Sequence, residues 1–117
     1  MSIFKSKIPL YRMKVVYTDC AKTFNKETGC ELDTNHSGGG TYRSGNTIYI
    51  YLPFCVKTGF EIPDVAHEAF HAADFVSDWV GMEYKEASGN EHIAYLITFF
   101  TEYIFDCGSK IMKKDGD

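Results

Sequence analysis

Hydrophobic and polar residues alternate in parts of the first half of the chain, which is the pattern of a strand with one buried face. Residues 11–19 alternate in part and are rich in β-branched and aromatic side chains, so they predict a strand. Residues 47–52 alternate between aliphatic side chains and tyrosines, and they predict a second strand that Pro53 ends. Between the two strands we expect a short helix that Asp19 caps and Gly29 ends.

Helical spacing replaces alternation in the second half of the chain. Between Pro63 and Gly81, valines and alanines recur every three or four residues, and the flanking residues suit a helix start and a helix stop. The same spacing of apolar side chains predicts a second helix over residues 88–107. The glycine-rich residues 35–46 predict a loop or the tip of a hairpin, and the charged residues 109–117 predict a flexible tail.

The order of these elements predicts the fold class. A chain of 117 residues is expected to form a single domain, residues 1–117. The order is strand, short helix, hairpin, helix and helix, which indicates an α+β fold. We expect a small antiparallel or mixed sheet that packs on the two C-terminal helices.

Composition and charge narrow the classes of function. The net charge is −4 and Lys and Arg form no dense run, so nucleic-acid binding is disfavoured. No apolar stretch is long enough to span a membrane, and the start of the chain is too charged for a signal peptide, so we expect a cytoplasmic protein. The cysteines occur singly along the sequence, which disfavours a four-cysteine zinc site. They are Cys20, Cys30, Cys55 and Cys107.

The first of the two long helices carries a pair of histidines on one face. His67 and His71 are four positions apart, and residues at this spacing lie one above the other on an α-helix. Two imidazoles so placed can bind one zinc ion, because zinc suits nitrogen ligands. Glu68 follows His67 directly, and a carboxylate at the open side of the ion can take a proton from a bound water. The alternative is a surface helix whose histidines are only solvated.

Catalytic zinc usually has three protein ligands, so the two histidines require a third group. Glu91 is the leading candidate, because an antiparallel helix pair would return the start of the second helix toward the ion. Asp74 and Asp78 lie further along the first helix, and a straight helix does not bring them to the same ion as His67. A capping role competes for Glu91, because Ser88 three residues earlier completes a capping-box pattern.

The pattern HEAFH, followed by 19 residues and then NEHIA, resembles the zinc site of the gluzincin metallopeptidases, of which thermolysin is the familiar member. The resemblance covers residues 62–105, and in size the chain is similar to minimal gluzincins of the ImmA and SprT-like types. It implies a zincin-like fold in which Zn²⁺ is bound by His67, His71 and Glu91. It also implies that Glu68 is the general base in the hydrolysis of a peptide or protein substrate.

Two further parts of a peptidase site have candidates in the sequence. Gluzincins pair an extended substrate with an edge strand above the active helix, and residues 47–52 are the candidate strand. The alternative is an ordinary core strand whose tyrosines cover the solvent-exposed face of the sheet. Tyr95 lies one turn after Glu91, and we expect it to donate a hydrogen bond to the oxyanion of the tetrahedral intermediate. The alternative for Tyr95 is packing against the first helix. The other candidate donors are His92, Tyr84 and His36.

The competing function is a binding module that keeps the zincin-like fold and captures a partner without turnover. Both hypotheses allow bound zinc. Only the enzyme requires Glu68 as a base, so substitution of this residue separates them. A purely structural zinc site is disfavoured, because a closed site does not require a carboxylate at that position.

Overall fold

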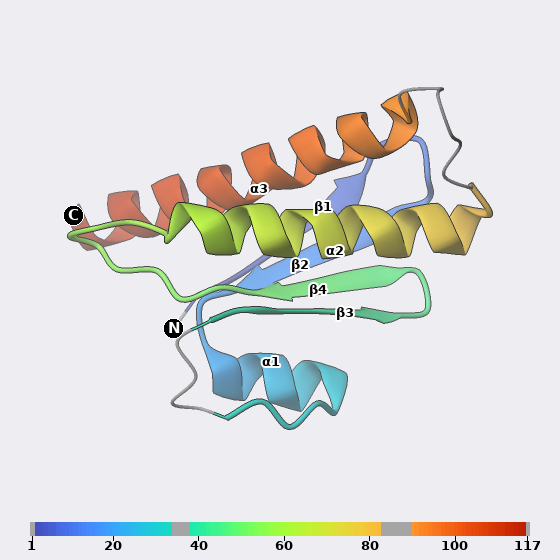
Figure 1. Ribbon diagram of the computed structural model, residues 1–117. Coiled ribbons are helices and arrows are strands. Elements are labelled where there is room, and N and C mark those ends of the chain that lie inside the picture. The colour runs from blue at the N-terminus through green and yellow to red at the C-terminus, as the bar shows by residue number, and fades with distance from the viewer. Residues whose placement is uncertain (1, 34–37, 83–89, 117) are drawn as a thin grey trace.

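A four-stranded mixed sheet lies between a short helix on one face and two long helices on the other (Figure 1). This computed structural model describes residues 2–33, 38–82 and 90–116. The α+β class and the small mixed sheet are therefore confirmed. In chain order the elements are β1 (Ile3–Ile8), β2 (Met13–Thr18), α1 (Ala21–Thr28), β3 (Gly40–Ser44), β4 (Thr47–Tyr51), α2 (Ile62–Val80) and α3 (Glu91–Gly116).

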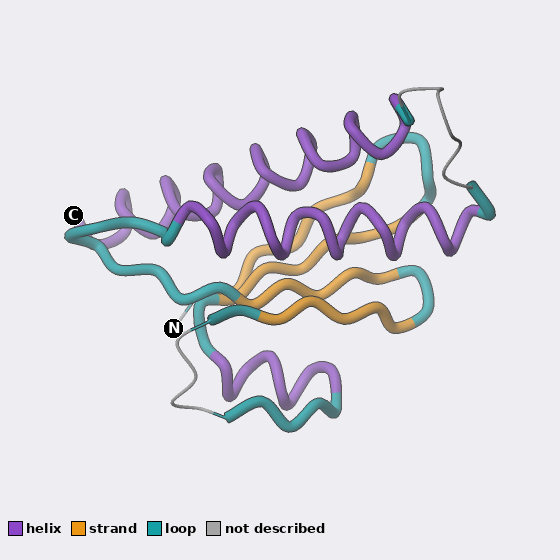
Figure 2. The backbone as a smooth tube through the Cα atoms, in the orientation of Figure 1, coloured by secondary structure: helices purple, strands orange, loops and turns teal. Residues whose placement is uncertain are grey.

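The order of the strands across the sheet is β1-β2-β4-β3, so β1 and β3 are the edges. The pairs β1–β2 and β3–β4 are antiparallel, whereas β2 and β4 are parallel at the centre. Parallel strands require a crossover connection, and here it contains α1 and β3 (Figure 2). The outcome is that β3 returns to the free side of β4 and forms an edge.

Three segments differ from the sequence prediction. The N-terminal part forms a hairpin of β1 and β2, whereas the alternation predicted one strand. Residues 40–44 were expected to be loop or hairpin tip, but they form β3 because they pair along their whole length with β4. Residues 109–116 continue α3 instead of forming a flexible tail, since Ile111 is buried in the core. The predicted helix start at Ser88 lies outside the described residues.

Strand β4 supplies apolar side chains to both faces of the sheet. Ile48 and Ile50 are fully buried in the main core, on the side of the long helices. Tyr51 points to the other face and packs against Phe24 of α1, with the two ring centroids 6.2 Å apart. The predicted alternation of β4 is thus confirmed, and each layer of helices packs on its own set of side chains.

Helix α2 packs against the sheet on one side and against α3 on the other (Figure 1). Pro63 lies in its first turn, and it ends at Gly81, whose φ of 78° is in the left-handed region that favours glycine. Its buried apolar side chains are small, which allows the backbones to approach closely. They are Val65, Ala69, Ala72, Ala73 and Val76. In the described parts of the chain, neither this helix nor any other is long and apolar enough to cross a membrane.

Aromatic side chains join the segment before α2 to the C-terminal half of α3. The rings of Phe54 and Phe60 meet edge to face with centroids 4.9 Å apart, and Phe60 also contacts Phe105 at 5.8 Å. A glycine is required at position 108, because a Cβ there would lie 2.7 Å from Cε2 of Phe60. The segment before α2 therefore packs closely against α3 at Gly108.

The four cysteines all lie among the described residues, and all are free thiols. Cys107 is buried in the core, and this burial raises the pKa of its thiol to about 11. Cys55 is exposed in the turn before α2, where a hydrogen bond with Thr58 lowers the pKa of its thiol below the ordinary value. Cys107 is therefore part of the packed core, whereas the thiol of Cys55 is open to solvent.

Replacing Phe100 with Ala removes a fully buried ring from the core, and we expect it to lower the free energy of unfolding by about 3–5 kcal/mol. Tyr95 lies on the same helix and is 72% exposed, so Tyr95→Ala is expected to change that free energy by less than about 0.5 kcal/mol. Urea unfolding followed by circular dichroism measures both variants. Equal losses for the two variants would contradict the core position of Phe100.

Candidate functional site

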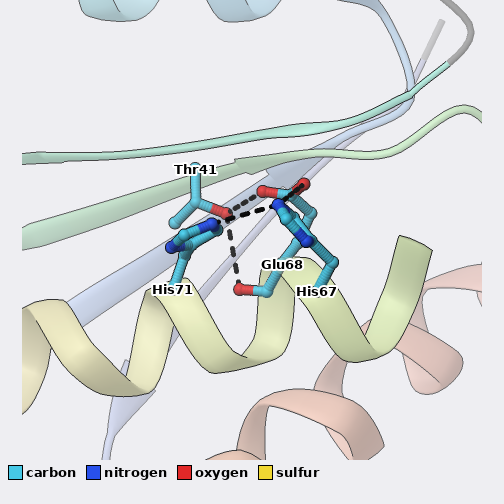
Figure 3. Close-up of polar contacts among 4 residues, drawn as sticks. All are labelled: Thr41, His67, Glu68 and His71. Atoms are coloured by element: carbon cyan, nitrogen blue, oxygen red, sulfur yellow. Dashed lines mark hydrogen bonds and ion pairs between the residues drawn. The ribbon is translucent and has the colours of Figure 1, made fainter. Parts of the chain in front are cut away.

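Two histidine side chains converge on the exposed face of α2, below the edge strand β3 (Figure 3). The Nε2 atoms of His67 and His71 are 3.1 Å apart, and their rings meet at 77°. Two nitrogen ligands of one tetrahedral zinc ion, each about 2.05 Å from the metal, are separated by about 3.3 Å. The separation of the two nitrogens is therefore close to the one that a shared zinc ion requires, and it is also a hydrogen-bond distance between the two rings.

Glu68 belongs to the same turn of α2 but points toward the sheet. Successive helix positions differ by about 100°, so a residue next to an exposed histidine can face inward. Glu68 is 5% exposed, and its Oε2 atom lies 3.9 Å from Nε2 of His67. The structure thus brings the carboxylate beside the pair of imidazoles while keeping it away from bulk water.

The carboxylate of Glu68 has a specific hydrogen-bond donor on β3. The Oγ1 hydroxyl of Thr41 donates to Oε1 of Glu68 over 2.7 Å, and it also lies 3.4 Å from the main-chain oxygen of the same residue (Figure 3). A buried carboxylate without such a partner would cost several kcal/mol, so this contact explains how α2 can bury Glu68.

The chain just before β3 passes unusually close to Glu68. A Cβ on Gly39 would lie 3.0 Å from Cγ of Glu68, and 2.7 Å from both Cδ2 of Leu52 and the main-chain oxygen of Tyr51. Only glycine fits this place without displacing a neighbour. The glycine-rich stretch therefore has a packing role against the candidate site.

A second contact joins β3 to α2 closer to the end of that helix. The guanidinium carbon of Arg43 lies 4.7 Å from the centroid of the Trp79 ring, within the range of a cation–π interaction. Thr41 and Arg43 therefore face the helix, as the period of two along a strand requires. These two contacts join β3 to α2 at Glu68 and at Trp79, on either side of His71.

Sequence reasoning missed Thr41 and Gly39. The residues Gly45 and Asn46 follow a run of β-forming side chains and precede β4, and this combination is a hairpin signal. Gly45 has a φ of 58°, as the first central residue of a tight hairpin turn requires. Recognising this turn would have extended the hairpin back through residues 40–44.

Glu91 lies at the other end of the helix pair. Helix α3 runs antiparallel to α2 and begins beside the end of α2 (Figure 1). His71 precedes Val80 by nine residues, which corresponds to about 13 Å along the helix axis. Glu91 is exposed and lines a cavity of about 490 Å³ together with the turn that contains Leu10 and Tyr11. Residues 2–33, 38–82 and 90–116 contain no group of three His, Cys, Asp or Glu side chains that could hold a metal ion.

The expected oxyanion donors do not gather at the histidines. Tyr95 and His92 line the same cavity as Glu91, on the side of α3 that faces the turn between β1 and β2. Tyr84 and His36 lie outside the described residues. The structure thus brings together His67, Glu68 and His71, and it places Glu91 and Tyr95 elsewhere.

The strand beside the site is also different from the expected one. Residues 47–51 form β4, which pairs with β2 on one side and with β3 on the other, so it offers no open edge to a substrate. The open edge above α2 is β3. The expectation of substrate pairing with residues 47–52 is therefore wrong, and any strand pairing at this end of the sheet would involve β3.

Comparison of the chain with protein-family models, with curated proteins and with solved structures found no match. The candidate site is therefore defined by its own geometry. That geometry consists of two converging imidazoles, one buried carboxylate and one hydroxyl donor under an open strand edge.

Replacing Gly39 with Ala tests the close approach of the chain to Glu68. The added Cβ would lie too near Glu68, Leu52 and a main-chain oxygen, so we expect the free energy of unfolding to fall by about 1–3 kcal/mol. NMR spectra of the labelled variant should also show displaced resonances for Glu68. Gly29→Ala is the control for the clash, because a Cβ on Gly29 would have no atom within 4 Å. Its φ of 77°, which Gly39 does not share, adds a backbone cost in the control but no contact with Glu68, so the Glu68 resonances should stay in place. Unchanged Glu68 resonances in Gly39→Ala would contradict the contact.

Proposed function

We propose that this protein is a zinc-dependent metallopeptidase with a zincin-like site on α2. His67 and His71 would hold Zn²⁺ through their Nε2 atoms, and Glu68 would act as the general base. The observation that carries the proposal is the separation of 3.1 Å between the two Nε2 atoms, with Oε2 of Glu68 3.9 Å from one of them. The two Nε2 atoms are also within hydrogen-bond distance of each other, so the buried carboxylate of Glu68 beside them is what favours a metal site over two solvated histidines.

In the proposed hydrolysis, the zinc ion and the carboxylate of Glu68 have different roles. When bound, zinc polarises the scissile carbonyl and lowers the pKa of a coordinated water to about 7. Glu68 takes a proton from the attacking water at its Oε2 atom, and it then gives this proton to the nitrogen of the leaving amine. Glu68 therefore starts and ends the reaction as a carboxylate. Its Oε1 atom remains hydrogen-bonded to Thr41.

The open edge of β3 supports a peptide or protein substrate. In the register with β4, Thr41 and Arg43 stand opposite Ile50 and Ile48. Alternate residues of an edge strand direct their main-chain N–H and C=O groups away from the sheet. In a hairpin with a two-residue turn, the two residues next to the turn, here Ser44 and Thr47, are hydrogen-bonded to each other. The outward-facing main-chain groups of β3 are therefore those of Arg43 and Thr41. An extended peptide that pairs with these groups would cross directly above His67 and His71.

The proposed zinc site also requires a third protein ligand. The resemblance to gluzincins implies Glu91, and this role stays a prediction, because in the described residues Glu91 lines the cavity beside Tyr11. Ligation by Glu91 would require the first turn of α3 to leave that cavity and approach His71. Its contribution can be measured directly through the metal content of Glu91→Gln.

The second candidate function is a binding module that does not hydrolyse its partner. The observation that favours it is that the described part of the chain brings no third metal-binding side chain to His67 and His71. The open edge of β3 would serve a bound partner as well as a substrate. Peptide cleavage therefore decides between the two functions.

His71→Ala removes one of the two converging imidazoles, and we expect the variant to lose the zinc ion that the wild-type protein binds. One remaining histidine on the same helix provides a single ligand, which does not hold zinc against dialysis. Elemental analysis after dialysis against buffered zinc measures the metal content. His92→Ala is the matched control, because His92 lies on α3 and lines the cavity beside Leu10 and Tyr11.

If the wild-type protein contains less than one zinc ion per chain after this dialysis, the proposed metal site is wrong. In the same experiment, loss of zinc from Glu91→Gln would show that the start of α3 moves to the ion, and retention of zinc would assign the third position to another ligand.

Glu68→Gln keeps the shape of the side chain but removes the base. We expect the variant to bind zinc as the wild type does and to cleave peptides at least about 100-fold more slowly. Cleavage of a mixed peptide library, followed by mass spectrometry, measures the rate. Equal rates for both proteins would exclude Glu68 as the base, whereas zinc binding without cleavage by the wild type would favour the binding module.

A further inference from the structure

Glu68 is hydrogen-bonded to Thr41 of the edge strand β3, and in the proposed function a substrate would pair with the main chain at this residue. Its Oε1 atom accepts the hydrogen bond of 2.7 Å from the Thr41 hydroxyl, which leaves Oε2 on the side of His67. The two carboxylate oxygens therefore have different surroundings. One faces the strand and the other faces the imidazoles, as Figure 3 shows.

The hydroxyl of Thr41 is itself held in a defined place. Thr41 is paired with Ile50 in the register of the β3–β4 hairpin, and threonine has a stiff χ1 because it is branched at Cβ. Gly39 lies against the side chain of Glu68, so close that a Cβ on Gly39 would be 3.0 Å from Cγ of Glu68. Together these contacts leave the side chain of Glu68 little freedom to rotate.

On the basis of the proposed function, we infer that Thr41 is a positioning residue that keeps Glu68 acting as a base instead of a metal ligand. A carboxylate 3.9 Å from a histidine that binds zinc is close enough to turn and bind the ion itself. The hydrogen bond to Thr41 opposes this rotation, because it would be broken without a replacement. Oε2 therefore stays available to a water molecule.

The hydroxyl also suits both protonation states of the base. It donates to Oε1 when Glu68 is a carboxylate, and the main-chain oxygen of the same residue, 3.4 Å away, offers a second acceptor. When Glu68 carries the proton on Oε2 during turnover, Oε1 is a carbonyl oxygen and still accepts the hydrogen bond from the hydroxyl. The contact thus does not have to break when the proton moves.

A purely structural role for Thr41 predicts different behaviour. In that case the hydroxyl would only join β3 to α2, as the contact of Arg43 with Trp79 also does. Its removal would lower stability and loosen the substrate strand, which would raise KM. A positioning role predicts a fall in kcat with little change in KM, because the substrate still binds but the base is misdirected.

The experiment compares Thr41→Val, which removes the hydroxyl at nearly constant shape, with Thr41→Ser, which restores it. We expect kcat to fall at least about tenfold in Thr41→Val and to return to within about threefold of wild type in Thr41→Ser, with KM changed less than about twofold. Zinc content should equal that of the wild type in both. Thr47→Val is the matched control, since Thr47 lies on β4 and its hydroxyl donates to Asn46 in the hairpin turn.

A second measurement does not depend on activity. In metal-free protein with ¹³C-labelled glutamate carboxyl groups, Thr41→Val should shift the Glu68 signal, whereas Thr41→Ser and Thr47→Val should leave it near its wild-type position. If Thr41→Val does not fold, Thr41→Ala replaces it in both measurements.

Each result either supports or overturns the role of Thr41. A rise in KM at constant kcat, an unchanged rate, or an unshifted Glu68 signal would each overturn it. If the wild type binds zinc and cleaves no peptide, the proposed function fails. In that case the ¹³C signal still decides whether Thr41 holds the Glu68 carboxylate.

Discussion

The packing of α2 beneath the edge of the sheet is the constraint from which the candidate site follows. Small buried side chains, among them Ala69 and Ala72, let the helix backbone lie close to the strands. At this distance one helical turn can direct Glu68 into the protein and His67 out of it. The carboxylate is therefore desolvated while the neighbouring imidazole keeps 65% of its side-chain surface exposed. Two very different environments meet within a few ångströms.

This juxtaposition has a chemical consequence. A buried carboxylate is stable only with a hydrogen-bond donor, and the sheet supplies one through Thr41. Exposed imidazoles can be reached by an ion and by a substrate from solution. The strand that provides the donor is also an edge of the described sheet. In the proposed peptidase, substrate binding and orientation of the base would therefore involve the same few residues of β3.

The length of α2 separates the two parts of the zinc motif that the sequence suggests. The helix continues to Val80, and α3 returns from that point, so its first residue lies near the end of α2. A third ligand at the start of α3 suits a shorter zinc helix or a connection that loops back to the histidines. Here the first turn of α3 instead lines a cavity with the turn between β1 and β2. In the proposed zinc site, a third protein ligand would therefore come from another part of the chain or from a displaced first turn of α3.

The sequence by itself determined the local features. The alternation in β4, the apolar faces of α2 and α3, the stop at Gly81 and the neighbouring positions of His67 and His71 all follow from short-range periodicity, so they could be predicted.

Tertiary structure decided the features that depend on residues far apart in the chain. Residues 40–44 became an edge strand because β4 offered a partner, and residues 109–116 became helix because Ile111 reached the core. The contact between Thr41 and Glu68 spans 27 positions of sequence, and the distance from Glu91 to the histidines depends on how far α2 extends before the chain reverses. No periodicity encodes such distances, because they arise only when the elements pack together.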